Sequence, residues 1–381
     1  MAKEAENERY AAMLLSRLGY YHLQEMQTLY RAAGSARAVV EAASDIRQLL
    51  PDASPRLVEL LSRLPEHRKR VDGELEYVRQ HDDIQVLTPS DSGYPQRLQH
   101  CPDAPLVLYK RGPADLNAPR VVCVVGTRRC TRYGQDLIRS FVRRLRELCP
   151  GALLVSGLAY GVDVCAHREC LACSMPTVGV LAHGLDDLYP RPHRETASQM
   201  VAQGGALLTE FMTHTPADKV NFVRRNRIVA GMSDAVVLVE SAAKGGGLIT
   251  CGIGRDYGRD VFAFPGPVGA PYSEGCNNLI RDNGAGLISS ADDLVSAMGW
   301  QSDQKLAHAH RSGIERQLFP DLSPDEQRVV DALRRQNDLQ MNDLCVRTGI
   351  TIGTLTALLF SLEMKGLVRA YAGGSYHLLS D

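Results

Sequence analysis

The spacing of hydrophobic positions divides the chain into regions with different periods. Before residue 75, apolar side chains recur every three to five positions, as at Leu14, Leu18, Leu23, Met26 and Leu29. This spacing is close to the helical period and is typical of amphipathic helices. We therefore expect a small helical domain over residues 1–75.

From residue 120 onward, short apolar runs alternate with helical stretches. The runs are V-V-C-V-V-G, A-L-L-V-S-G, T-V-G-V-L-A-H-G, A-L-L-T-E-F, A-V-V-L-V-E-S and V-F-A-F-P-G. Each run is almost wholly apolar, as expected for a strand buried on both faces. The alternation predicts an α/β fold, an extended Rossmann-like, doubly wound and mostly parallel sheet, over residues 80–299. Within it, residues 80–118 are expected to form turn-rich connections.

The last part of the chain has a third pattern. Residues 300–320 are mostly polar without an apolar period and are interpreted as a linker. In S-P-D-E, Ser323 is the expected N-cap of a helix and Glu326 its N3 residue. Three short helical segments and a hairpin turning at Gly373 and Gly374 then predict a winged helix over residues 321–381.

Composition excludes several classes of protein. Of 381 residues, 44% are hydrophobic and 23% are charged, and the net charge is −1, so any preference for nucleic acid must be local. The ten cysteines do not suggest a disulfide scaffold in a chain of this length. The polar N-terminus does not resemble a signal peptide, and no apolar run is long enough for a membrane span. We expect a cytoplasmic protein without membrane contact.

The first strand of the sheet ends in an unusually basic segment, V-V-G-T-R-R-C-T-R-Y-G at residues 124–134. Residues 120–146 contain eight arginines and one acid. The helix that follows offers backbone N–H groups to an anion, and Arg128 adds a planar phosphate donor. We expect an anion site at Gly126, Thr127 and Arg128, with Arg129 and Arg132 as supporting charge, whereas the arginines of residues 139–146 are better explained as a solvated helix face.

A second strand end carries S-G-L-A-Y-G-V-D-V-C-A-H, residues 156–167. Ser156 begins the stretch, and Gly157 and Gly161 permit close approach of a ligand to the backbone. Asp163 and His167 are four residues apart and share one helical face. Two interpretations stay open, half of a metal site or an acid that stabilises the helix and orients the imidazole, and the second is favoured because no further ligands are evident.

Two further basic segments follow. H-G-L-D-D-L-Y-P-R-P-H-R-E supplies Arg194. N-F-V-R-R-N-R-I-V-A-G places Arg224, Arg225 and Arg227 near Phe222, a combination of cations and an aromatic ring that suits single-stranded nucleic acid. The alternative, equally compatible with the sequence, is a structural helix whose arginines pair with acids such as Glu210 and Glu240.

The last candidate is K-G-G-G-L-I-T, residues 244–250. Its glycines, including Gly246 and Gly247, precede a helix and predict another phosphate-binding turn, although the pattern is not a Walker A motif. Cys170-x-x-Cys173 is more typical of core cysteines than of a zinc site. We predict no cofactor, no metal site and no catalytic residues.

Taken in order, these segments resemble the DNA-processing protein A family (DprA, also called Smf). The resemblance also rests on Y-P-Q-R-L and P-D-A-P-L-V-L-Y at residues 94–109 and on the late G-C-N-N-L-I. It implies a Rossmann core that binds single-stranded DNA, dimerises, and loads the RecA recombinase onto that DNA in natural transformation. It also implies an N-terminal helical module, expected to be SAM-like, and a C-terminal winged helix. Arg128, Gly157, Gly161 and the basic Arg194 match positions of the family pattern.

The chain departs from the family pattern at single positions. His193 stands where the family commonly has Asn, Val223 replaces a common proline, and Gly246 replaces a common serine. The winged-helix segment holds six Lys and Arg against eight Asp and Glu, and its expected recognition helix, T-I-G-T-L-T-A-L-L-F-S-L-E, has no basic residue. Since duplex binding depends on phosphate neutralisation, we expect a protein-contact role for this domain.

Three hypotheses about function follow. The first is a non-catalytic single-stranded DNA binder that captures phosphates with Arg128, Arg194 and Arg224 or Arg227. The second is an enzyme resembling nucleoside-monophosphate phosphoribohydrolases, which carry P-G-G-x-G-T-x-x-E; here no Glu precedes Asp256 in the matching region. The third is a nucleotide sensor that uses the same pocket without turnover.

Overall fold

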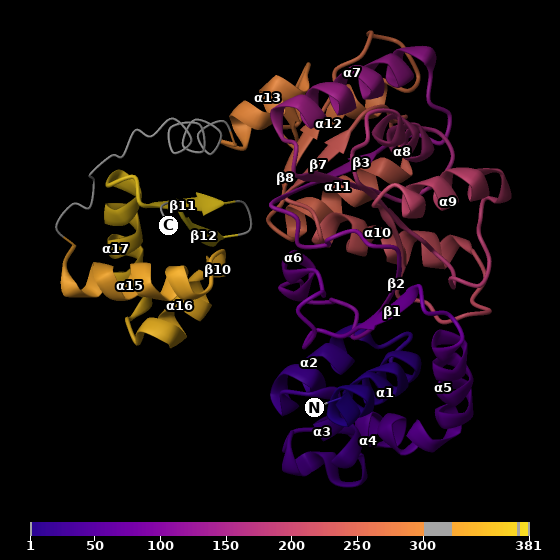
Figure 1. Cartoon of the computed structure of the whole chain (residues 1–381), viewed down its shortest axis with the longest axis vertical. Coiled ribbons are helices and arrows are strands. Elements are labelled where there is room, and N and C mark those ends of the chain that lie inside the picture. Colours follow the sequence, from indigo (N-terminus) through magenta and orange to yellow (C-terminus); the bar gives the residue numbers. More distant parts are fainter. Residues whose placement is uncertain (1, 301–321, 372–373, 380–381) are drawn as a thin grey trace.

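The computed structural model describes residues 2–300, 322–371 and 374–379. Figure 1 shows a helical domain at the N-terminus, a central α/β domain, and a small C-terminal domain set to one side. The segment expected to be a linker lies outside the described residues except for Trp300. Trp300 is only 3% exposed and belongs to the core of the α/β domain.

The N-terminal domain is helical, as the apolar spacing predicts. Its elements are α1 (Ala2–Leu18), α2 (Leu23–Ala33), α3 (Ala36–Glu41), the 3-10 helix η1 (Ala43–Gln48), α4 (Pro55–Ser62) and α5 (Leu64–Arg79). The Ser35 hydroxyl accepts a hydrogen bond from the Ala38 N–H, and Ser54 caps α4 in the same way ahead of Pro55. The specific likeness to SAM domains stays a prediction.

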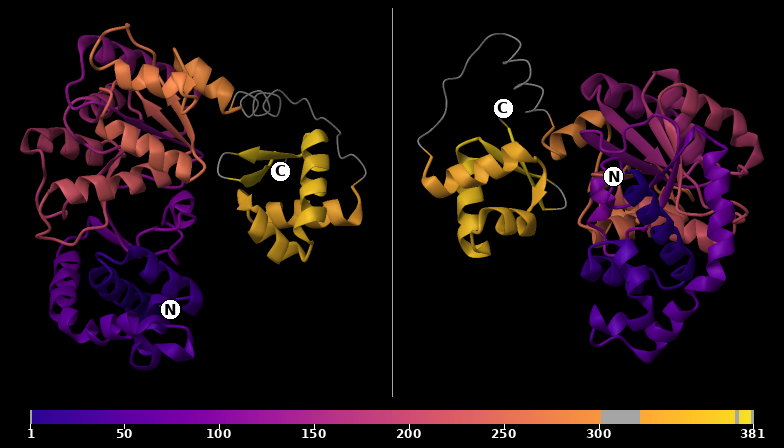
Figure 2. Two further views of the ribbon diagram at one scale, coloured as in Figure 1. Left: turned by 180° about the vertical axis from the view of Figure 1, so that it is seen from behind. Right: turned by 60° about the horizontal axis from the view of Figure 1, so that its bottom comes forward.

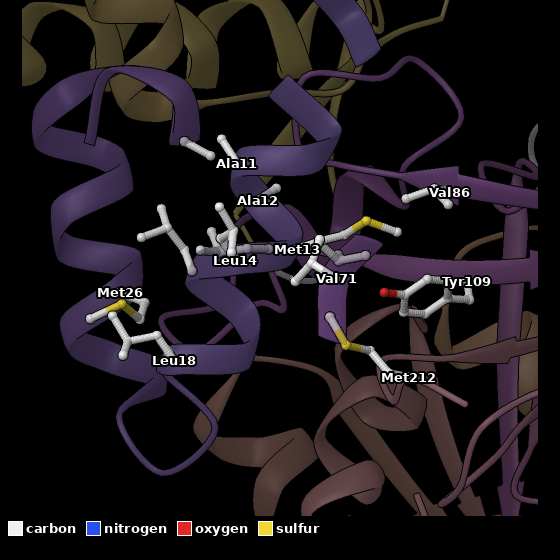
Figure 3. Packing of buried hydrophobic residues seen from close by; sticks show 14 of the residues in the cluster. Ala11, Ala12, Met13, Leu14, Leu18, Met26, Val71, Val86, Tyr109 and Met212 are labelled. Atoms are coloured by element: carbon white, nitrogen blue, oxygen red, sulfur yellow. The ribbon is translucent and has the colours of Figure 1, made fainter. Parts of the chain in front are cut away.

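The helical domain shares its hydrophobic core with the edge of the sheet. Met13 and Val71 of the helices belong to the same buried cluster as Tyr109 and Met212 of the α/β domain. Figure 3 shows these side chains converging from both domains. Burial of this shared apolar surface fixes the helical domain to the α/β domain.

The central sheet has nine strands in the order β1-β2-β6-β5-β4-β3-β7-β8-β9. Their bounds are β1 (Ile84–Leu87), β2 (Leu108–Arg111), β3 (Arg120–Val125), β4 (Ala152–Ser156), β5 (Thr177–Val180), β6 (Ala206–Thr209), β7 (Ala235–Leu238), β8 (Asp260–Ala263) and β9 (Gly286–Leu287). In this spatial order, every pair of neighbouring strands from β6 through β5, β4, β3, β7 and β8 to β9 is parallel, so the mostly parallel α/β sheet is confirmed. β1 and β2 add an antiparallel edge within the segment expected to hold only connections.

Helices cover both faces of the sheet. One face carries α7 (Arg132–Leu148), α8 (Val162–Ala172), α9 (Arg194–Ala202) and α13 (Ala291–Ala297); the other carries α6 (Gln96–Gln99), α10 (Lys219–Gly231), α11 (Gly246–Asp256) and α12 (Glu274–Arg281). The chain runs outward from β3 through β4 to β6, then returns to β7 on the other side of β3. This reversal is the topological switch point of the sheet, where open α/β folds bind ligands.

The C-terminal domain is a winged helix, as expected. It consists of α15 (Pro324–Arg335), β10 (Leu339–Gln340), α16 (Met341–Thr348), α17 (Ile352–Met364), β11 (Val368–Tyr371) and β12 (Ser375–Leu378). The capping box of Ser323 and Glu326 is confirmed. Gly374 of the expected hairpin turn is described, whereas Gly373 lies outside the described residues.

The winged helix contacts the α/β domain through its hairpin, at the end of the sheet where the parallel strands begin. The Arg369 guanidinium donates to the Gly299 carbonyl over 2.8 Å. The Arg120 guanidinium lies over the rings of both Trp300 and Tyr371, at 5.4 and 5.0 Å from their centroids. Figure 2 shows the winged helix beside the sheet from two further directions.

Among the described residues, no single helix has the length and apolar character to cross a membrane. Only α16 and α17 taken together reach that length and composition, and they are bent by 106° at the break between them.

Candidate functional site

An open cavity of about 720 Å³ lies at the switch point, where β3, β4 and β7 end. The turn after β3 forms one wall, the N-terminal half of α10 a second, and the glycine-rich start of α11 a third. The backbone N–H groups at the start of α11 have no partner within their helix and favour an anion at this wall.

Close backbone packing holds the turn after β3 in place. A side chain at Gly161, where φ is +77°, would collide with the Thr127 carbonyl and the Arg128 backbone. Gly126 lies against Gly247, because a Cβ added at Gly247 would be 3.2 Å from the Gly126 Cα. The glycines of three different segments therefore let three strand ends meet. Gly161 has a packing role, and its expected contact with a ligand stays a prediction.

Arg128 is exposed at the rim of the cavity and has an aromatic support. Its guanidinium carbon lies 4.8 Å from the centroid of the Phe222 ring. Tyr189, which is 46% exposed, meets Phe222 edge to face with ring centroids 5.9 Å apart. A cation and two aromatic rings thus share one wall of the cavity, an arrangement that can hold a phosphate beside a flat ligand.

Two further cations at the cavity were missed as site residues. Lys219 and Lys244 both line it and are exposed. Lys219 occupies the first turn of α10, directly after the N-cap Asp218, where a positive charge opposes the helix dipole. This unfavourable placement is the sequence signal that could have identified Lys219.

Two of the three arginines of α10 are committed to an internal ion-pair network. Arg224 and Arg227 both bind the Glu210 carboxylate, with guanidinium–carboxylate distances of 3.0 and 2.5 Å. Their side chains are 11% and 6% exposed, and that of Glu210 is 1% exposed. The alternative interpretation, a structural helix whose arginines pair with acids, therefore holds for Arg224 and Arg227. Neither side chain lines the cavity.

The third arginine, Arg225, lies beneath the cavity. It is 3% exposed and donates to the Val180 carbonyl. A side chain at Gly157 would overlap its guanidinium, so Gly157 makes room for Arg225, and its expected contact with DNA stays a prediction. Burial raises the pKa of Asp163, which also lines the cavity, while the charge of Arg225 opposes that rise.

The expected pair of Asp163 and His167 does not form. The His167 Nδ1 is 2.7 Å from the Thr177 hydroxyl, and Asp163 instead accepts from the Ala159 N–H over 3.3 Å. Burial lowers the pKa of His167 to about 3, so the imidazole is neutral. No group of three or more His, Cys, Asp or Glu side chains suited to a metal ion occurs in the described part of the chain.

The structure brings together about half of the residues that the sequence singles out. Those that line the cavity are Gly126, Thr127, Arg128, Phe222, Arg225, Gly246 and Gly247. Ser156 is fully buried and donates to the Val124 carbonyl. Arg194 is exposed and lines a separate cavity of about 520 Å³, where it pairs with Asp187 at 3.2 Å.

Comparison with known proteins assigns the chain to one family of DNA-processing proteins. A family model described as DNA recombination-mediator protein A matches residues 85–299, and a model described as the DprA winged helix domain matches residues 315–374. The chain belongs to the DNA recombination-mediator protein A (DprA/Smf) family.

Individual relatives support this assignment. The Protein Smf of Escherichia coli is 33% identical and covers 82% of this chain and 82% of its own length. The putative DNA processing protein DprA of Mycobacterium tuberculosis is 35% identical, with 76% of this chain and 75% of its own length covered.

Two solved structures of the family are similar to this one. DNA processing protein A from Streptococcus pneumoniae aligns with a TM-score of 0.63 at 28% identity, covering 76% of this chain and 97% of that one. The Helicobacter pylori protein, described by its single-stranded DNA binding mode, aligns with a TM-score of 0.51 at 28% identity, covering 57% of this chain and 96% of that one.

Proposed function

We propose that this protein binds single-stranded DNA in the cavity at the switch point of its sheet. The observation that carries the proposal is the exposed Arg128 guanidinium held over the Phe222 ring at the rim of that cavity. Lys219 and Lys244 add positive charge at the other walls. The described binding mode of the Helicobacter pylori relative supports the same ligand.

The physical argument is that the cavity offers both kinds of contact that a single strand needs. Arg128, Lys219 and Lys244 neutralise phosphates, and the N-terminus of α11 adds backbone donors. Phe222 and Tyr189 offer ring surfaces to unpaired bases. A duplex hides its base faces, so it gains only the phosphate contacts and is expected to bind more weakly.

The role of that binding is proposed to be non-catalytic. The strand would be held and passed to the RecA recombinase, in recombination and natural transformation, in the cytoplasm. The family's description as a recombination mediator supports this role. Dimerisation through the Rossmann domain would place two cavities on one strand and raise the affinity through avidity.

Fluorescence anisotropy with labelled oligonucleotides tests the proposal. We expect single-stranded DNA to bind at least about tenfold more tightly than duplex of equal length. A mononucleotide should compete only at far higher concentration, because it offers one phosphate and one base. Equal competition by a mononucleotide would favour a nucleotide sensor, and release of free base from it would favour an enzyme.

A further inference from the structure

We propose that Tyr160 stacks on a base of the bound DNA strand, on a path that runs from the switch-point cavity to Arg194. This inference rests on the proposed function, because it extends the path of the same ligand. It also assigns a DNA contact to a residue that neither the motifs nor the cavity singled out.

The position of Tyr160 is the first support. It lies between Ala159, which lines the cavity, and Gly161, which packs against the backbone of Thr127 and Arg128. The Val162 N–H also donates to the Thr127 carbonyl over 3.1 Å. The loop that carries Tyr160 is therefore in direct contact with the turn that carries Arg128.

The second support is the exposure and orientation of the ring. Tyr160 is 43% exposed, which is a large surface for an aromatic side chain in the middle of a folded domain. Its ring meets the His193 imidazole edge to face, with ring centroids 4.8 Å apart. His193 is buried, and its Nδ1 is 2.9 Å from the Leu158 carbonyl, so the support beneath Tyr160 is fixed.

The third support is what lies beyond His193. Arg194 is the next residue, and its side chain is 65% exposed. Arg128 and Arg194 line different cavities. The loop that carries Tyr160 contacts the turn of Arg128 through Gly161, and the Tyr160 ring contacts His193, the residue before Arg194. A strand that runs from Arg128 past this ring towards Arg194 would meet an aromatic side chain and then a cation, the alternation that suits a sugar-phosphate chain with unpaired bases.

The length of the DNA provides the test. Single-stranded thymidylates of about 4 and about 12 nucleotides span the range of compact binding sites. We expect Tyr160→Ala to weaken binding of the longer oligonucleotide roughly tenfold and that of the shorter one less than about twofold. Tyr160→Phe keeps the ring and should bind both oligonucleotides like the wild type.

Tyr133→Ala is the matched control. Tyr133 is 42% exposed, and its hydroxyl donates to the Pro265 carbonyl after β8, on the other side of the switch point from β4 and β5. Its loss should leave both affinities unchanged. Equal losses in Tyr160→Ala and Tyr133→Ala would overturn the proposal.

A second measurement separates stacking from a structural role. Wild-type protein should prefer the longer thymidylate over an abasic sugar-phosphate chain of equal length, and Tyr160→Ala should lower that preference roughly tenfold. An unchanged preference, or an equal loss with both oligonucleotide lengths, would overturn the role of Tyr160. Failure of the proposed function is a different result, in which Arg128→Ala binds both lengths as tightly as the wild type.

Discussion

The turn after β3 and helix α10 both bring arginines to the same part of the sheet, but they use them differently. Arg128 is exposed and stands over an aromatic ring. Arg224, which is largely buried, and Arg227, which is buried, both pair with the single carboxylate of Glu210. An arginine count in a sequence therefore does not measure a binding surface, because the fold decides which guanidinium groups still face solvent.

The largest effect should come from breaking the buried network of α10. Glu210→Gln leaves two buried cations without their shared carboxylate and should lower the free energy of unfolding by about 3–5 kcal/mol. Chemical denaturation of the whole chain measures this loss. Glu195→Gln, at an exposed position of α9, is the control and should change stability by less than about 0.5 kcal/mol. Comparable stability of the two variants would contradict the structural role of Arg224 and Arg227.

The opposite result is expected for the exposed turn. Arg128→Ala should weaken binding of single-stranded DNA about tenfold with little change in the melting temperature, since the exposed guanidinium loses only its contact with the half-buried Phe222 ring. Anisotropy and thermal unfolding on the same preparation separate the two effects. Arg129→Ala, the neighbouring exposed position, is expected to lose less affinity. A fall in stability for Arg128→Ala would place it with the arginines of α10.

The sequence predicts the sheet better than it predicts the site. Continuous apolar runs identify β3 to β8, because strands buried on both faces need them. β1 and β2 are not predicted, because each has only four residues and a polar or charged one, Gln85 and Lys110, within it. Whether Arg224 and Arg227 face solvent or form internal ion pairs depends on Glu210. Glu210 follows a different strand, so only the assembled sheet shows that the three side chains meet.

The winged helix provides a third case, an ion pair whose contribution to stability depends on pH. In the winged helix, Lys365 donates to the Glu326 carboxylate over 2.7 Å, and this contact, with hydrogen bonds from the Ser323 N–H and the Ser361 hydroxyl, lowers the pKa of Glu326 to about 2. Because the folded pKa lies below the ordinary value of 4.5, the stabilisation is complete above about pH 4.5 and is lost as the pH falls towards 2.

Glu326→Gln tests this linkage. Near neutral pH the variant should be less stable than the wild type by about 1–2 kcal/mol, and the difference should shrink as the pH falls through the window. Thermal unfolding across this pH range follows the winged-helix transition. A difference that stays constant with pH would show that the carboxylate charge does not matter.

The smallest effect is expected for duplex DNA. α17, the expected recognition helix, contains no Lys or Arg, and its exposed face carries Ile352, Phe360 and Met364. A chain that ends after Trp300 should therefore bind duplex within about twofold of the full chain. Gel shifts at equal salt, with the full chain and with the truncated chain, measure the two duplex affinities. A large loss on truncation would give the winged helix a role in duplex binding.

The salt dependence of single-stranded DNA affinity tests the central claim most directly. If Arg128 contacts a phosphate at the switch-point cavity, the log–log slope of affinity against salt should be steep in the wild type and smaller by about 0.7 in Arg128→Ala. The slope of Glu195→Gln should equal that of the wild type. An Arg128→Ala protein with the wild-type slope and affinity would contradict the account.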